Sequence, residues 1–353
     1  MKVLQVCAYA AQYSGNFMAS LLTLDKYLAT FGVQTMYLFP ESAAQMPWCQ
    51  QLQTERTVFF ADSNRFSWKT YRQIKYAMKD ADIVHSHFEL YDCLCALAKK
   101  KHQKLFWHLH DSFDENIDAV HRIINRVQYD LFGRRAVLIS PNRYYADYTV
   151  KLGFPAKNVH IVDNCIDCGR LQSTAQTERK YDFFAFGGFY KIKGTDILMD
   201  ACRLLVSQGL SFSVGIVGYP ATWDYLEQNY PDLRNCIIPL TPAEDVNPFY
   251  NSTGVFLSTS RRESFSYALL EALYKERPAI VSNIVGTQWA KAFDSVAFFE
   301  NEDAEGLAQQ MKAFLTGQLW YTPQSLRMAA QKVTQQYDCA AWARRIEEIY
   351  RGE

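Results

Sequence analysis

The chain has 353 residues, which is enough for about two domains of ordinary size. Hydrophobic residues make up 49% of it and charged residues 21%, a balance that excludes disordered, collagen-like and disulfide-scaffold proteins. The 37 basic residues are matched by 37 acidic ones, so the sequence gives no general electrostatic reason to expect a nucleic-acid-binding protein.

Short apolar runs of strand length alternate with longer stretches of helical length along the whole chain. In the first half the runs are 2–8, 35–39, 83–87, 105–109, 136–140 and 159–162. In the second half they are 181–186, 212–217, 236–240, 254–257, 279–282 and 297–299. This alternation predicts parallel sheets covered by helices. The predicted fold class is therefore α/β, with two successive doubly wound, Rossmann-like units.

The polar stretch that begins near residue 165 has the composition of a linker. We expect a first domain over 1–168, a second over 169–335, and a C-terminal segment over 336–353. Within that segment, 337–350 is amphipathic and predicts a helix. The chain up to residue 165 carries 19 basic and 15 acidic residues, a net +4, and the remainder carries −4.

Nine cysteines are scattered along the chain, and this odd number favours reduced thiols in a cytoplasm over a disulfide framework. Cys165 and Cys168 form a lone C-x-x-C without a second pair, so we interpret them as part of a loop. No window of eighteen uninterrupted apolar residues exists, and we therefore expect no transmembrane helix. The apolar run near the start contains Gln5 and predicts a buried first strand rather than a signal peptide.

Two histidines are candidates for a ligand site in the first domain. A doubly wound sheet binds ligands at the carboxyl ends of its strands, and His87 and His110 end consecutive apolar runs. Asp111 follows His110 and could orient an acceptor hydroxyl group. A single histidine in such a place is more often structural, so the alternative is a core role.

The most informative segment of the second domain is 258–272, where a strand ends, a turn follows and a helix begins. Glu263 and Glu271 are eight residues apart, a little over two helical turns, so both face one side. The free N–H groups at the helix start can receive a diphosphate, and Ser264 and Ser266 would add hydroxyl donors. The alternative is a capping acid and a solvated helix residue.

This segment resembles the Glu-x7-Glu motif of retaining GT-B glycosyltransferases, in particular glycosyltransferase family 4. Five further stretches resemble motifs of that family in the same order: the strand and glycine turn at 3–15, D-I-V-H-S-H at 82–87, L-H-D at 109–111, V-D-N-C-I-D at 162–167 and F-G-G-F-Y-K-I-K-G at 186–194. The resemblance thus covers nearly the whole chain.

The resemblance implies two Rossmann-like domains that face a cleft, the first for the acceptor and the second for the donor, with the C-terminal helix crossing back to the first. It implies retaining transfer of a sugar from a UDP- or GDP-sugar to a hydroxyl of a glycan or lipid-linked acceptor, as in bacterial surface polysaccharide synthesis. Residues placed by the motifs at catalysis are Glu263, His110 and Lys193. Those placed at the donor are Gly15, Gly187, Lys193, Ser264, Phe265, Ser266 and Glu271, and the acceptor-side candidates are His87 and Asp111.

Two residues depart from the family pattern. Gly188 stands where an arginine usually binds the donor phosphates, and Cys165 replaces a glycine. Lys191 is the candidate to replace the arginine, whereas Lys193 keeps the family's lysine position, where an ammonium can neutralise the leaving diphosphate. A solvated loop lysine is the alternative for Lys193.

We expect no metal or other cofactor. The sequence has one D-x-D, at 80–82, and it enters a strand, which is the wrong edge of the sheet for a metal at the phosphates. Two other functions remain open: a nucleotide-sugar epimerase of the same fold, and a non-catalytic sugar-binding relative.

One further stretch suggests contact with a membrane. On a helix over 65–79, four basic residues share one face and three apolar ones lie opposite: Arg65, Lys69, Arg72 and Lys79 against Tyr71, Ile74 and Met78. Such a helix can lie on anionic lipid, although a solvated helix packed by its apolar side has the same pattern. The expected location is cytoplasmic, with peripheral contact at the inner face of the plasma membrane.

Overall fold

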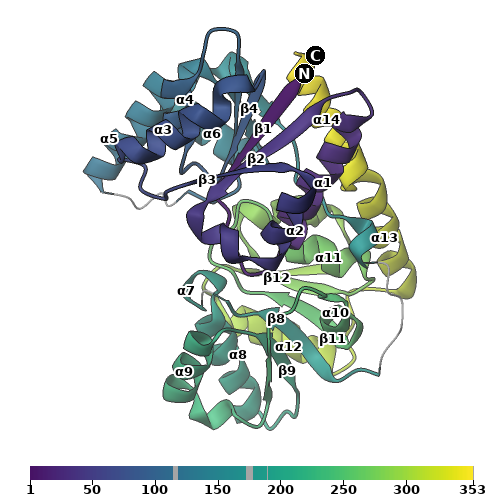
Figure 1. Cartoon of the computed structure of the whole chain (residues 1–353). Coiled ribbons are helices and arrows are strands. Elements are labelled where there is room, and N and C mark those ends of the chain that lie inside the picture. The colour runs from purple at the N-terminus through teal and green to yellow at the C-terminus, as the bar shows by residue number, and fades with distance from the viewer. Residues whose placement is uncertain (114–117, 172–177, 189, 353) are drawn as a thin grey trace. The chain divides into compact units, whose positions relative to one another are not determined.

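The computed structural model describes residues 1–113, 118–171, 178–188 and 190–352. The chain forms two compact units: Met1–Cys165 with Cys339–Glu353, and Ile166–Asp338. Each unit is built on a parallel sheet with helices on its faces, so the predicted α/β class with two Rossmann-like units is confirmed (Figure 1). The unit boundaries fall after residues 165 and 338, where 168 and 335 were expected. A β-bridge pairs Ile166 with Asp338, the first and the last residue of the second unit.

The first sheet has seven parallel strands in the order β3-β2-β1-β4-β5-β6-β7. Their bounds are β1 Lys2–Cys7, β2 Gln34–Pro40, β3 Thr57–Ala61, β4 Ile83–His87, β5 Lys104–His108, β6 Val137–Ser140 and β7 Val159–Ile161. Six of these were predicted and β3 was missed. It is a half-buried edge strand of five residues, TVFFA, four of them apolar, and it directly follows the helix over 47–55.

The helices of the first unit are α1 Gly15–Ala29, α2 Pro47–Glu55, α3 Trp68–Ala77, α4 Asp92–Ala98, α5 Ala119–Val127, α6 Arg143–Lys151 and α14 Cys339–Arg351. The strands are largely buried on both faces, which explains their nearly continuous apolar runs. The core joins residues of α1 and α14 to those of the central strands.

The second sheet has six parallel strands in the order β10-β9-β8-β11-β12-β13, and all six were predicted. Their bounds are β8 Tyr181–Phe186, β9 Val214–Val217, β10 Ile237–Leu240, β11 Thr253–Ser258, β12 Ala279–Asn283 and β13 Val296–Glu300. The helices are α7 Tyr190–Lys193, α8 Thr195–Ser207, α9 Pro220–Asn229, α10 Asn247–Asn251, α11 Tyr267–Tyr274, α12 Ala304–Leu315 and α13 Pro323–Gln336. Strands β8 and β11 are neighbours, so the loops that follow them emerge side by side.

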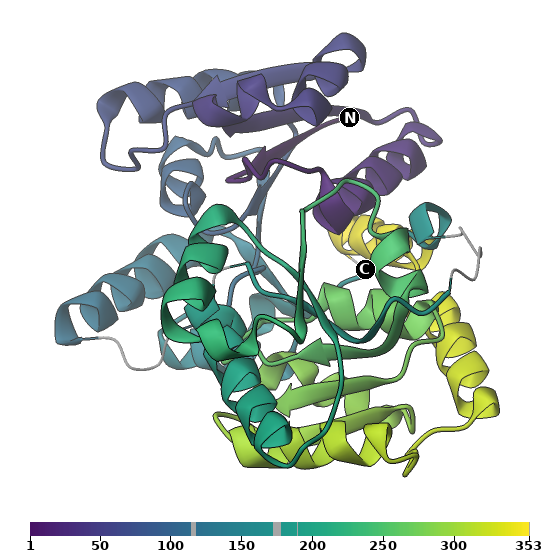
Figure 2. The same ribbon diagram turned by 90° about the horizontal axis from the view of Figure 1, so that it is seen from below.

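The last helix of the chain belongs to the first unit. Figures 1 and 2 both show α14, in yellow, beside α1, in purple. Trp342, Ile346 and Tyr350 of α14 are buried in the core of that unit. The amphipathic pattern at the C-terminus therefore reflects a helix that packs on a sheet built from residues 2–161.

Removing α14 should unfold the first unit. Each of its large buried side chains contributes roughly 1.5–3 kcal/mol, and the sum approaches the 5–15 kcal/mol that stabilises a typical domain. A chain ending at residue 338 should lose one unfolding transition in differential scanning calorimetry, whereas a chain ending at Arg351 should melt like the full-length protein. A stable, cooperatively folded first unit without α14 would contradict this expectation.

Candidate active site

The second unit brings two of the predicted catalytic residues into direct contact. Lys193 is the last residue of α7, in the connection after β8, and Glu263 lies in the turn between β11 and α11. Lys193 Nζ and Glu263 Oε1 are 2.6 Å apart. Because β8 and β11 are adjacent parallel strands, their carboxyl ends present both side chains at one edge of the sheet.

Glu263 is a largely buried carboxylate. Its side chain is 11% exposed, against 33% for Lys193. Oε1 also accepts a hydrogen bond from Ser260 Oγ at 2.8 Å, while Oε2 is buried and has no hydrogen-bond partner among the residues that the structure describes. Burial raises the pKa of Glu263, but the Lys193 ammonium and the hydrogen bonds from Lys193 and Ser260 outweigh it and hold the pKa below its usual value. The carboxylate is therefore ionised at neutral pH.

The backbone around Lys193 is fixed against the end of β11. Gly194 has φ +61°, and a Cβ atom there would lie 2.0 Å from the carbonyl oxygen of Thr259, so only glycine fits. Thr259 Oγ1 donates to the carbonyl of Lys193 at 2.8 Å, and the N–H of Arg261 donates to the carbonyl of Ile192 at 2.9 Å. These contacts set the position from which Lys193 reaches Glu263.

Arg261 is a cation of this loop that the sequence analysis did not assign. Its guanidinium makes two 2.7 Å contacts with Asp196 and also pairs with Glu302 at 2.6 Å. Two carboxylates neutralise its charge, and the bonds raise its pKa above the ordinary arginine value. Arg261 therefore ties α8 to the end of β11.

The turn that opens α11 is more closed than the sequence suggested. Ser264, Phe265 and Ser266 are all buried, and the Phe265 ring stacks on Trp289 with centroids 5.1 Å apart. The N–H of Ser266 donates to the carbonyl of Gly286 at 3.2 Å. The Phe265 side chain therefore belongs to the core, and one backbone donor of the turn already has a partner.

Glu271 lies on α11 beside an arginine that the sequence analysis missed. Its Oε2 accepts a hydrogen bond from Tyr250 at 2.7 Å, and its Oε1 is 3.5 Å from Arg170 Nη2. Nε and Nη1 of Arg170 are buried and have no hydrogen-bond partner within the described ranges. Arg170 lies in a short helical turn, Cys168–Leu171, at the start of the expected linker, where no motif singles it out.

The glycine loop after β8 leaves room at the position where the family has an arginine. A Cβ on Gly187 would lie 2.7 Å from Ile216, so this residue must stay small. A Cβ on Gly188 would approach Tyr219 only to 3.7 Å, an ordinary contact. Lys191 is exposed, and its carbonyl accepts a hydrogen bond from Arg261 at 2.7 Å.

In the first unit the predicted histidines are also in contact. His87 ends β4, His110 follows β5, and His87 Nδ1 is 2.9 Å from His110 Nε2. His85 and His108, which the sequence analysis did not assign, lie on the same face of these two strands. Burial lowers the pKa of all four histidines, so their imidazole rings are neutral at neutral pH.

Three of these rings are close enough to raise the question of a metal site. The nearest nitrogens of His85, His87 and His108 lie within 4.8 Å of one another. However, both nitrogens of His87 make hydrogen bonds, and the rings of His85 and His108 are parallel, with 2° between planes and 5.3 Å between centroids. Zinc ligands must converge at about 2.0–2.1 Å from one point. We therefore interpret the cluster as stacked rings.

The other first-unit candidates lie at the same edge of the sheet. Gly15 begins α1 with φ +56°, a backbone conformation that favours glycine. Asp111 is exposed at this edge, and desolvation by the surrounding protein raises the pKa of its carboxyl group. Just after β4, Phe88 and Glu89 both have positive φ, 64° and 54°, which is uncommon for residues with side chains and clusters at functional sites. Burial raises the pKa of Glu89 to about 7 although Tyr129 donates a hydrogen bond to it.

Asp92 at the start of α4 gives a pH-dependent prediction. It is 1% exposed, and burial raises the pKa of its carboxyl group to about 8 from 3.8. Because the pKa is raised in the folded state, folding favours the protonated carboxyl group of Asp92. This contribution to the free energy of unfolding is fully present below pH 4 and is lost as the pH rises to about 8. Asp92→Asn should therefore gain about 4 kcal/mol of unfolding free energy relative to wild type between pH 5 and pH 8.

Urea unfolding at the two pH values measures this difference for Asp92. The same substitution at the exposed Asp80 serves as the control for removing a carboxylate from the surface. An Asp92→Asn protein whose stability relative to wild type is the same at both pH values would contradict the assignment of a buried, protonated carboxyl group.

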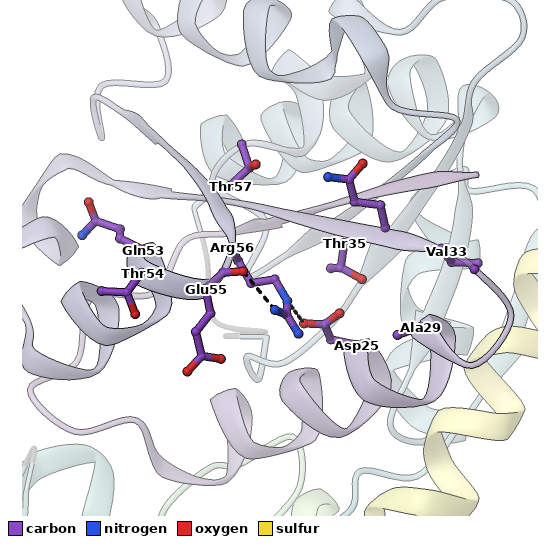
Figure 3. A pocket seen from close by; sticks show the side chains of 11 residues that line it. Asp25, Ala29, Val33, Thr35, Gln53, Thr54, Glu55, Arg56 and Thr57 are labelled. Carbon is purple, nitrogen blue, oxygen red and sulfur yellow. Dashed lines mark hydrogen bonds and ion pairs between the residues drawn. The ribbon is translucent and has the colours of Figure 1, made fainter.

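A hollow of about 560 Å³ in the first unit lies at the other edge of its sheet. It is lined by the starts of β2 and β3, and Figure 3 shows the side chains of Asp25 and Arg56 pointing toward each other inside it. Arg56 Nε is 2.7 Å from Asp25 Oδ2. Ligands of doubly wound sheets bind at the carboxyl ends of strands, so this ion pair is structural.

Comparison with known proteins gives two family matches. Residues 20–170 match the family described as Glycosyltransferase Family 4, and residues 180–317 match the family described as Glycosyl transferases group 1. The amylovoran biosynthesis glycosyltransferase AmsK of Erwinia amylovora is 22% identical over 62% of this chain and 57% of its own length. The capsular polysaccharide biosynthesis glycosyltransferase CapM of Staphylococcus aureus is 23% identical over 36% and 35%. The matched region thus spans less than two thirds of either relative.

Solved structures share the fold over the whole chain. A glycosyltransferase from Rickettsia africae ESF-5 has a TM-score of 0.80 at 16% identity, covering 99% of this chain and 98% of its own. Anabaena Alr3699/HepE in complex with UDP has a TM-score of 0.80 at 15% identity, with both chains fully covered. Each unit thus matches a glycosyltransferase family, and the chain as a whole has the two-domain GT-B fold.

Proposed function

We propose that this protein is a retaining glycosyltransferase that moves a sugar from a UDP- or GDP-sugar to a hydroxyl of a glycan or lipid-linked acceptor in bacterial surface polysaccharide synthesis. The observation that carries the proposal is the 2.6 Å contact between Lys193 and Glu263 at the carboxyl ends of β8 and β11. The matched relatives act in amylovoran and capsular polysaccharide biosynthesis, and HepE is described with UDP and with UDP-glucose. The complexes of HepE support a UDP-sugar as the donor, and the two relatives support a role in polysaccharide synthesis.

The leaving diphosphate gains negative charge as the bond to the sugar breaks. Lys193 has three N–H donors, of which one serves Glu263, so the others can serve phosphate oxygens. The N–H groups that open α11, with Ser264 and Ser266, would add to this stabilisation. Gly187 would let the diphosphate approach the backbone after β8.

The two glutamates of the motif would hold the two ends of the donor. Glu263 would contact the sugar with its buried Oε2, and Glu271 the ribose hydroxyls. In the transfer step the bond from the anomeric carbon to the diphosphate breaks, and a bond to the acceptor oxygen forms on the same face of the sugar. The acceptor proton passes to the leaving diphosphate, so this scheme needs no metal.

The first unit would supply the acceptor side. His110 would contact the donor sugar and Gly15 would approach its diphosphate, while His87 and Asp111 would lie on the acceptor side. A GT-B epimerase or a non-catalytic sugar-binding relative would place similar residues at the donor. A panel of UDP- and GDP-sugars, with mass detection of products, separates the three: a transferase releases the nucleoside diphosphate, an epimerase interconverts donors, and a binding protein leaves them unchanged.

The helix proposed to contact the membrane is α5 rather than α3. Ile74 of α3 and Met78, which follows that helix, are buried in their own unit, so the predicted apolar side cannot reach lipid. Lys69 of α3 pairs with Glu41 at 2.9 Å. The helix α5 instead has no buried residue. Its exposed apolar side chains are Val120, Ile123, Ile124 and Val127, with Arg122 and Arg126 on the same helix. No helix within the described residues is long and apolar enough to cross a bilayer. We propose that α5 contacts anionic lipid.

Changing Ile123 and Val127 to asparagine should weaken vesicle binding at least tenfold, since each side chain would otherwise bury its apolar surface at roughly 25 cal/mol per Å². Co-sedimentation with anionic vesicles measures this, and binding should also weaken with salt. Reversing Lys69 and Arg72 on α3 to glutamate serves as the comparison and should have the smaller effect. Wild-type protein that shows no lipid dependence would contradict the proposal.

A further inference from the structure

A chain of buried hydrogen bonds joins His110 to the last helix of the protein. His110 Nε2 is 2.9 Å from His87 Nδ1, and His87 Nε2 is 2.9 Å from Gln5 Oε1. Gln5 Nε2 donates to Tyr350 Oη at 3.2 Å, and Tyr350 Oη is 2.6 Å from His85 Nδ1. Gln5, His85, His87 and Tyr350 are each at most 2% exposed. Water therefore does not replace these partners.

The donors and acceptors of this chain can be assigned from one end to the other. An amide oxygen only accepts, so His87 Nε2 carries the proton that Gln5 Oε1 receives. A neutral imidazole has one N–H, which leaves His87 Nδ1 as an acceptor. His110 Nε2 must then carry the proton that His87 Nδ1 accepts. The lone pair of His110 is therefore on Nδ1.

The orientation of the Gln5 amide sets the direction of this chain of hydrogen bonds. With Gln5 Nε2 donating to it, Tyr350 donates its own hydroxyl proton to His85 Nδ1. If the Gln5 amide were reversed, its NH₂ group would face His87, every proton along the chain would change place, and His110 would carry its proton on Nδ1. The orientation of the Gln5 amide and the tautomer of His110 are therefore coupled, and the orientation in which Gln5 Oε1 faces His87 places the His110 proton on Nε2.

We propose that Gln5 and Tyr350 are positioning residues that, through His87, hold His110 with its proton on Nε2 and its lone pair on Nδ1. A lone pair there accepts a hydrogen bond from a hydroxyl of the donor sugar, whereas a proton on Nδ1 would require the same hydroxyl to act as the acceptor and to give up that donation. This consequence rests on the role proposed above for His110. The proposed role of Gln5 and Tyr350 explains why a glutamine lies among the buried residues of β1 and why a tyrosine of α14 reaches His85.

The tautomer can be read directly by NMR. The full-length protein, labelled with ¹⁵N-histidine, contains seven histidines, and the two ring nitrogens of each give separate signals whose shifts report protonation. Signals of His110 and His87 are assigned by replacing each in turn with asparagine. We expect protonated Nε2 and unprotonated Nδ1 for both residues in the wild-type protein. A protonated Nδ1 on His110 would overturn the proposal.

Two variants test whether Gln5 and Tyr350 set the tautomer of His110. In Gln5→Met, His87 Nε2 loses its acceptor, and because a buried N–H without a partner is costly, the proton should move to Nδ1 and donate to His110. His110 should then carry its own proton on Nδ1. Tyr350→Phe, which removes only a hydroxyl, should yield a mixture of both tautomers. Thr35→Val, a buried change in β2 away from this chain, should leave every histidine signal unchanged.

Kinetics test the functional consequence. Gln5→Met should lower kcat for donor turnover about tenfold, the effect of losing one hydrogen bond worth roughly 1.4 kcal/mol, with a smaller change in the donor KM. Unaltered signals of His102, His121 and His160 would show that the variant is folded. A His110 tautomer that stays the same in both variants overturns the proposal. A wild-type protein without any turnover overturns the proposed function, while the NMR result still decides the positioning role.

Discussion

Replacing Lys193 with methionine should lower kcat about a hundredfold or more. The ammonium is placed to offset charge that grows on the leaving diphosphate, and removing one such preorganised donor typically costs a hundred- to thousandfold in turnover. The same change leaves Glu263, 11% exposed, without its cation, so the pKa of that carboxyl group should rise. The measurement is kcat at saturating donor, and the loss should exceed any change in donor KM.

Lys191→Met is the matched control for Lys193. It lies in the same short helix, is exposed, and has no recorded contact with Glu263. If Lys191 replaces the arginine missing at Gly188, this variant should raise the donor KM and leave kcat nearly intact. A Lys193→Met enzyme with unchanged kcat and only a raised donor KM would contradict the role given to Lys193.

Glu263→Gln should reduce turnover at least tenfold. The substitution keeps the size of the side chain but removes the charge that pairs with Lys193 and that would face the donor sugar. Because the two residues are in contact, the double variant should lose less than the product of the two single effects. Steady-state kinetics of the four proteins measure this coupling.

Glu271→Gln separates the two glutamates of the motif. Glu271 accepts a hydrogen bond from Tyr250 and would hold the ribose, so its replacement should act mainly on the donor KM. Unchanged turnover of Glu263→Gln at saturating donor would remove Glu263 from the active site. Equal effects of the two substitutions on kcat would show that both carboxylates act in the chemical step.

The fold could be predicted to a large extent from the sequence because buried parallel strands give continuous apolar runs. Twelve of the thirteen strands were found in this way, including the half-buried edge strands β7 and β10; the missing one, β3, is a short apolar edge strand. The apolar side of α3 was predicted as well, but periodicity shows only that a side is apolar. Whether Ile74 meets lipid or its own domain depends on packing, and the structure buries it.

The candidate site was predicted residue by residue but not as an arrangement. Lys193 and Glu263 each follow an apolar run, yet their contact depends on β8 and β11 being neighbours, which the order along the chain does not give. Arg170 lies in a segment of linker composition, and no pattern marks it. Gln5 was noted as an interruption of the first strand, and its partner Tyr350 is 345 residues away in sequence.

One experiment tests the central claim most directly: ¹H NMR of the wild-type protein incubated with UDP-α-glucose, UDP-N-acetyl-α-glucosamine or GDP-α-mannose, with water or a sugar as acceptor. The proposal predicts that at least one donor yields free nucleoside diphosphate and that the first product signal belongs to the α-anomer, before mutarotation. Lys193→Met under the same conditions should release nucleotide at least a hundredfold more slowly. A β-anomer as the first product would contradict retention, and a folded protein that releases no nucleotide from any of these donors would contradict the proposed transfer.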